Sequence, residues 1–280
     1  MNQKRFRTAA AGVILLLCGC IVALERKAVA AADAGTATQP ATADVTIGDM
    51  TPHTKGPYTA FLCPFNAKRF RLTGTESATI TPAFPAGTKL VWSWPMRSAP
   101  TVIGFLQVAG YGNYYNTVPQ TPISPQQVNQ IKTLTVSHDL SFSGTENGFN
   151  VIYDYFLTRT ANGNDNHLFE IEVFIHTSGA AAKYIRSVTQ IGRTTISGIK
   201  WTVTIDPAAH PPDILFMPAN QADVSAGTID LKAMHDYLIS KGRIMGNEFY
   251  NGHSLGVETI QGNGKLTVKS ASATYVRLKE

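Results

Sequence analysis

The chain has 280 residues and a formal net charge of +5 at pH 7, from 24 Lys and Arg against 19 Asp and Glu. Residues 1–30 contain five of the basic residues and one of the acidic residues, so the rest of the chain has 19 basic and 18 acidic residues. This near-neutral balance gives no electrostatic case for binding nucleic acid or an anionic membrane surface. The length fits one or two domains, or one large β-sandwich.

The first 30 residues have the pattern of an export signal. A positive segment (residues 4–7) precedes an almost wholly apolar run (residues 9–24), and residues 28–30 (Ala-Val-Ala) offer a cleavage site. We therefore expect a secreted, extracellular protein. Cys20 supports an alternative, a lipoprotein of the outer surface or the periplasm, because the segment before it resembles a bacterial lipobox. Only in that case do we expect contact with a membrane.

The cysteines argue against internal disulfides. Cys18 and Cys20 lie in the signal segment, and Cys63 is the third cysteine of the chain. Cleavage after residue 30 would leave Cys63 alone, and cleavage before Cys20 would leave one lipid-blocked thiol beside it. Stability must then come from the hydrophobic core.

The body of the chain has a β pattern. Residues 31–56 are rich in Ala, Thr, Gly and Pro, which predicts a flexible leader, and residues 57–280 form the predicted domain. Short segments rich in β-branched and aromatic residues alternate with Gly, Asn and Ser turns. The candidate strands are residues 90–94, 102–108, 132–141, 150–157, 167–176, 194–205 and 265–278. Residues 230–241 have helical spacing of apolar residues, so we expect an all-β, two-sheet jelly-roll sandwich with one short α-helix.

Carboxylates on two of these strands are the candidate chemical groups. In the strand 167–176, Glu170, Glu172, Phe174 and His176 share one face, because side chains alternate along a strand. Asp154 lies in the neighbouring aromatic strand, where unpaired burial would be costly, so we expect it to face the same cleft or to lie beside Glu170, unless it is a strand-end Asp bonded to the backbone. Acids and an aromatic ring on one face are typical of a solvated sheet surface, but they also suit a sugar-binding cleft.

Glu258 is the second candidate acid. It lies in an apolar segment between Gly256 and Gly262, and apolar surroundings raise the pKa of a carboxyl group, as a general acid requires. Two carboxylates on separate strands are what the cleavage of a glycosidic bond needs, one as nucleophile or base and one as proton donor.

The order of these motifs resembles glycoside hydrolase family 12, a family of retaining endo-β-glucanases with a jelly-roll fold. The resemblance covers about residues 58–278. It rests on Tyr153-Asp154-Tyr-Phe, Phe169-Glu170-Ile-Glu-Val-Phe-Ile175, Thr195-Ile-Ser-Gly-Ile-Lys-Trp201 and Gly256-Val-Glu-Thr259. It implies that Glu170 is the nucleophile, that Glu258 is the acid/base, and that Asp154 hydrogen-bonds the nucleophile. It also implies a separation of about 5–5.5 Å between the two glutamates.

The chain also departs from the family pattern. Glu172 and Phe174 replace a Met and a Trp of the cleft, and Cys63 and Phe65 stand near the place of a paired Asn and a sugar-stacking Trp. We predict substrate contacts for Glu172, Phe174 and Phe65. Three tryptophans are further candidates, for which packing in the core is the alternative. They are Trp92, Trp94 and Trp201.

These features together predict a retaining endo-β-1,4-glucanase that hydrolyses plant β-glucans such as mixed-linkage glucan, soluble cellulose derivatives or xyloglucan. The alternatives are a weak or inactive carbohydrate-binding jelly-roll protein and a transglycosylase. We expect no cofactor and no metal site, since no histidines have metal-ligand spacing. The expected partner is the polysaccharide substrate, bound by a monomer.

Overall fold

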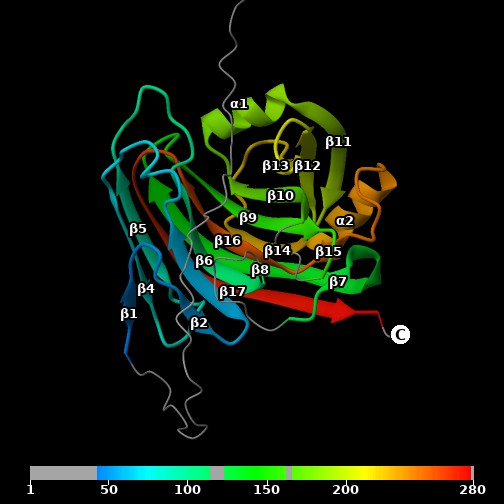
Figure 1. Ribbon diagram of the computed structural model, residues 1–280, viewed down its shortest axis with the longest axis horizontal. Helices are drawn as coiled ribbons and strands as arrows, with labels where there is room; N and C mark the ends of the chain where they lie inside the picture. Colours follow the sequence, from blue (N-terminus) through cyan, green and yellow to red (C-terminus); the bar gives the residue numbers. More distant parts are fainter. Residues whose placement is uncertain (1–42, 114–122, 162–165, 279–280) are drawn as a thin grey trace, which may run out of the picture.

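The computed structural model describes residues 43–113, 123–161 and 166–278, and its strands form two sheets (Figure 1). The smaller sheet has six strands in the order β1-β4-β5-β17-β8-β14. Their bounds are β1 Val45–Ile47, β4 Thr75–Ile80, β5 Lys89–Trp94, β17 Gly262–Arg277, β8 Ile131–Gly144 and β14 Ala226–Asp230. All pairs in this sheet are antiparallel.

The larger sheet has eleven strands, nine of them in the order β11-β12-β13-β10-β9-β16-β6-β3-β2. Their bounds are β11 Thr189–Ile196, β12 Ile199–Asp206, β13 Asp213–Pro218, β10 His167–His176, β9 Phe149–Thr158, β16 Gly252–Thr259, β6 Gly104–Gly112, β3 Tyr58–Cys63 and β2 His53–Lys55. The short strands β15 (Phe249–Tyr250) and β7 (Gln126–Gln127) pair beside β9. Strands β10 and β13 are parallel, and the other pairs are antiparallel.

The strands of the large sheet bury both of their faces. Along β9, Val151, Tyr153 and Tyr155 belong to the main core cluster, together with apolar residues of the small sheet. The alternate residue Ile152 belongs to a second cluster with Phe174 of β10. The predicted alternation along the strands is therefore confirmed, and the second face of the large sheet holds the candidate acids.

The two helices of the described residues pack into different hydrophobic clusters. Helix α2 (Leu231–Ser240) matches the predicted helix, and its buried apolar residues join the main core. Its N-cap is Asp230, whose Oδ1 accepts a hydrogen bond from the Ala233 amide at 2.9 Å. Helix α1 (Gly179–Ser187) contributes Ala182 and Ile185 to the second cluster. It contacts β13, and Figure 1 shows it beyond the edge of the large sheet that carries this strand. A 3-10 turn, Val128–Gln130, precedes β8.

Three expectations about the architecture need correction. The predicted leader 31–56 overlaps the fold, since β1 and β2 lie within it and pair with β4 and β3. One helix was predicted, but the structure has a second, α1, which buries Ala182 and Ile185. The predicted strand 194–205 spans a hairpin, because Ser197 and Gly198 both have positive φ, as the tight turn between paired strands requires.

The predicted signal segment lies outside the described residues. Within residues 43–113, 123–161 and 166–278, no helix is long and apolar enough to cross a membrane.

Candidate active site

Five carboxylates face the same side of the large sheet, on four neighbouring strands. Each residue is only 3% to 5% exposed. They are Asp154 on β9, Glu170 and Glu172 on β10, Asp213 on β13 and Glu258 on β16. Directly opposite residues of paired strands share a face, so the strand register places these side chains on one face of the sheet. The predicted acids Asp154, Glu170, Glu172 and Glu258 are therefore brought to one face.

The register also sets their order. Glu172 lies directly opposite Asp154, and Glu170 lies opposite Phe156. On its other side, Glu170 is in parallel register with Asp213. The expected position of Asp154 beside Glu170 is thus a diagonal one, with Glu172 as the direct neighbour of Asp154.

Glu258 is held by an amide. It lies opposite Asn150 of β9, and the Asn150 Nδ2 donates a hydrogen bond to Glu258 Oε2 at 2.9 Å. Burial raises the pKa of Glu258 to about 7, while the bond from Asn150 lowers it. A carboxyl group with this pKa keeps its proton at mildly acidic pH, which is the property that a general acid needs.

Asn150 also connects Glu258 to helix α1. Its Oδ1 accepts a hydrogen bond from the Ser178 amide at 2.8 Å, and Ser178 is the N-cap residue of that helix. Asn147 binds the next residue, since its Oδ1 accepts from the Gly179 amide at 2.7 Å. The two bonds of Asn150 fix which end of its amide points at the acid.

The other acids raise one another's pKa. Burial is the largest cause for Glu170, followed by the charges of Asp154, Asp213 and Glu258. Burial also raises the pKa of Glu172 and Asp213 well above the usual range, with further contributions from neighbouring acids. Buried carboxylates this close cannot all be ionised, so the group retains protons at pH values where free carboxylates have lost them.

Apolar and aromatic side chains adjoin the acids. Phe174 is buried in the second cluster, and Phe65 packs against that cluster from outside β3. Both therefore lie on the predicted face. Tyr184 of α1 packs there as well, and its hydroxyl donates a hydrogen bond to Asp206 Oδ2 at 2.6 Å.

Four predicted positions are corrected. Trp92, Trp94 and Trp201 belong to the main core cluster, away from the acids. The Trp92 ring packs edge-on against Phe149, with centroids 5.2 Å apart, and the Trp201 Nε1 donates to the Ile196 carbonyl at 3.2 Å. These rings are core residues because the inner faces of the two sheets need large apolar side chains. Their predicted role in substrate binding is therefore withdrawn.

His176 is the fourth corrected position. A register shift between Phe174 and His176 turns its side chain to the inner side of the sheet. There its ring stacks on Phe149, with centroids 4.6 Å apart, and its Nδ1 lies 2.8 Å from Asp223 Oδ1.

Three residues at the site were missed in the sequence. Asp213 is a single acid before the apolar run Ile214–Met217, the same signal that singled out Asp154. Asn150 and Tyr184 carry no comparable signal, because an amide in a strand and a tyrosine in a short helix are common.

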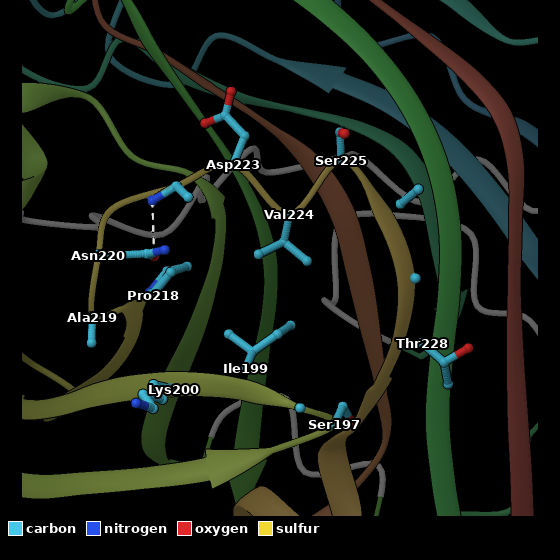
Figure 2. A pocket seen from close by; sticks show the side chains of 14 residues that line it. Ser197, Ile199, Lys200, Pro218, Ala219, Asn220, Asp223, Val224, Ser225 and Thr228 are labelled. Carbon is cyan, nitrogen blue, oxygen red and sulfur yellow. Dashed lines mark hydrogen bonds between the residues drawn. The ribbon is translucent and has the colours of Figure 1, made fainter.

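A surface pocket elsewhere offers a contrast to this site. Figure 2 shows a pocket of about 830 Å³ lined by the β11–β12 turn and the segment between β13 and β14. Its one acid is Asp223, and no aromatic ring lines it. It therefore lacks the paired acids of the large sheet. Among the described residues, no group of three or more His, Cys, Asp or Glu is arranged to hold a metal ion.

Comparisons with known proteins place this geometry in context. No family model matches the chain. A probable xyloglucan-specific endo-β-1,4-glucanase A of Aspergillus clavatus is 27% identical over 190 residues, which cover 67% of this chain and 74% of that protein. The xyloglucan-specific endo-β-1,4-glucanase A of Aspergillus aculeatus is 27% identical over 182 residues, 65% of this chain and 70% of that protein.

Solved structures share the fold. Endoglucanase 3 of Trichoderma harzianum, from family GH12, superimposes with a TM-score of 0.68 at 18% identity, over 85% of this chain and 100% of that chain. A family 12 xyloglucanase from Bacillus licheniformis gives a TM-score of 0.67 at 16% identity, over 84% of this chain and 100% of that chain. The resemblance drawn from the motifs is therefore confirmed: in sequence and in fold, the chain is similar to the enzymes of glycoside hydrolase family 12.

Proposed function

We propose that the protein is a glycoside hydrolase, a retaining endo-β-1,4-glucanase with Glu170 as nucleophile and Glu258 as acid/base. One observation carries this proposal. Glu258, with a pKa of about 7, faces the same side of the large sheet as Glu170, and a single strand, β9, separates their strands. A protonated acid beside other carboxylates provides the two different charge states that the reaction needs.

The reaction would proceed in two steps. The Glu170 carboxylate attacks the anomeric carbon and forms a glycosyl ester as the glycosidic C–O bond breaks. Glu258 gives its proton to the oxygen of that bond, and the leaving sugar departs as an alcohol. The ionised Glu258 then takes a proton from water, which attacks the same carbon and releases Glu170. Asp154 would hydrogen-bond the β10 carboxylates. The separation of about 5–5.5 Å between the two reacting carboxyl groups stays a prediction.

The substrate would be a plant β-glucan. The two Aspergillus relatives are named as xyloglucan-specific enzymes, so we place xyloglucan first among the candidates, before mixed-linkage glucan and soluble cellulose derivatives. Phe174, Phe65 and Glu172 would contact the sugar, since a ring can pack on a pyranose face while a carboxylate binds its hydroxyls. The polymer is extracellular, which agrees with the export signal. We propose a secreted monomer, with a lipid anchor at Cys20 as the alternative.

The test is the release of reducing sugar from these polymers by the purified exported protein. Glu170→Gln and Glu258→Gln should each lower kcat by several orders of magnitude. Glu146→Gln, at an exposed turn position, is the matched control and should keep wild-type activity. An aryl cellobioside with a good leaving group separates the two roles, because it needs no proton donor. It should restore the first step in Glu258→Gln and leave Glu170→Gln inactive.

Product analysis completes the test. Proton NMR of the first product should show the β-anomer, which indicates retention. Longer oligosaccharides in place of hydrolysis products would identify a transglycosylase. A folded wild-type protein that releases no sugar but is retained by an insoluble glucan would refute the catalytic proposal and indicate a carbohydrate-binding protein.

A further inference from the structure

Asp213 is an acid next to the proposed nucleophile that the proposed reaction does not use. It is the first residue of β13 and lies in parallel register with Glu170 of β10. The Glu170 amide donates a hydrogen bond to the Pro212 carbonyl at 3.0 Å, which ties the two strands together at this level. Neighbouring strands are about 4.8 Å apart, so the two side chains leave adjacent backbone positions on the same face.

Each of these two carboxyl groups has one buried oxygen that no described residue donates to. Glu170 and Asp213 are each 3% exposed. Within the described part of the chain, Glu170 Oε1 and Asp213 Oδ1 are buried oxygens without a hydrogen-bond partner. A buried carboxylate without a donor is costly, and two adjacent carboxylates cannot both be ionised at low cost. One proton held between the two groups would supply the missing donor for both.

We propose that Asp213 is a positioning residue that shares one proton with Glu170 and thereby fixes the charge and orientation of the nucleophile. This inference rests on the proposed function, which makes Glu170 the nucleophile. The sharing of a proton between the two carboxyl groups does not itself depend on catalysis. Burial and neighbouring acids raise the pKa of both groups, which agrees with a retained proton.

Other titratable groups on this face are less suited to the role. Glu258 has the Asn150 amide as its donor. Asp206 accepts from the Tyr184 hydroxyl at 2.6 Å and from the Ala208 amide at 2.9 Å. Asp154 lies directly opposite Glu172 and diagonal to Glu170, although its charge raises the pKa of Glu170 more than the charge of Asp213 does. His167 stacks on Phe156, with ring centroids 4.2 Å apart. Asp213 is the acid in direct cross-strand register with Glu170.

The test is the titration of the Glu170 side-chain carboxyl carbon, followed by NMR in the carbon-13-labelled exported protein. Asp213→Asn keeps the shape of the side chain and removes its acid. It should lower the midpoint of the Glu170 titration by about one pH unit or more. Asp206→Asn, the matched control one strand further away, should shift it by less than about 0.3 unit. Asp213→Ser removes the same acid with less bulk and should act like Asp213→Asn.

Activity gives a second readout. The acidic limb of kcat/KM should move to lower pH in Asp213→Asn by the same amount as the NMR midpoint, whereas a merely structural role would lower the melting temperature and leave the limb in place. An unchanged Glu170 midpoint in both Asp213 variants would overturn the inference. If the wild type hydrolyses no glucan, the proposed function fails, but the NMR titration still decides whether Asp213 and Glu170 share a proton.

Discussion

The hydrogen bond between Asn150 and Glu258 predicts how the alkaline limit of activity is set. Asn150 Nδ2 lies 2.9 Å from Glu258 Oε2 and stabilises the ionised acid, so its removal should raise the pKa of Glu258 above about 7. A hydrogen bond to a charged group contributes about 1.5–3 kcal/mol. Since one pKa unit corresponds to about 1.4 kcal/mol, Asn150→Ala should raise the pKa of Glu258 by about 1–2 units.

The assay is kcat/KM on soluble xyloglucan across roughly pH 4 to 10. Activity requires protonated Glu258, so the alkaline limb of the profile should move to higher pH by about 1–2 units, as the hydrogen-bond energy implies. Asn147→Ala is the matched control, because Asn147 also binds the start of α1, at Gly179, but does not contact Glu258. A folded Asn150→Ala variant with an unmoved alkaline limb, or an equal shift in Asn147→Ala, would refute the reasoning.

Two further predictions concern stability. Burial and the charge of Asp49 raise the pKa of Glu76 to about 9, so folding keeps a proton that the unfolded chain has lost above its ordinary pKa. The free energy of unfolding should therefore fall as pH rises from about 4.5 towards 9. In urea unfolding, Glu76→Gln should be more stable than the wild type by about 3 kcal/mol at pH 7 and nearly equal to it at pH 4. Trp92→Ala should cost about 3–5 kcal/mol of stability by the same measurement and leave KM unchanged; a raised KM without loss of stability would restore its predicted place in the cleft.

The strand alternation explains what could be read from the sequence. Side chains two residues apart share a face, so Glu170, Glu172 and Phe174 could be assigned together, and the motif order pointed to the fold that the comparisons confirm. The same rule failed at His176, because a bulge changes the face and leaves no mark in a short apolar segment. The choice between cleft and core could not be made for the tryptophans, because composition does not say which side of a sheet faces the other sheet.

Strand order could not be read at all. Asp213 follows Glu170 by more than forty positions in the chain, and only the parallel pairing of β10 with β13 makes them neighbours. A connection of that length leaves many pairings open, since a parallel pair needs a long crossover with no local signal of its partner. Asn150 was missed for a related reason, because its partners Glu258 and Ser178 come from two other elements.

The distribution of donors among the acids accounts for their different properties. Glu258 has an amide donor and a pKa of about 7, whereas Glu170 and Asp213 each have one buried oxygen without a donor among the described residues. A pair that shares one proton carries one negative charge, which is the charge that a nucleophile next to a neutral acid requires. Burying these acids lowers stability at neutral pH, because the unfolded chain ionises all of them. That loss of stability is expected where the chemistry needs two carboxyl groups in different charge states. The opposite face of the large sheet, which packs in the apolar core, has no such loss.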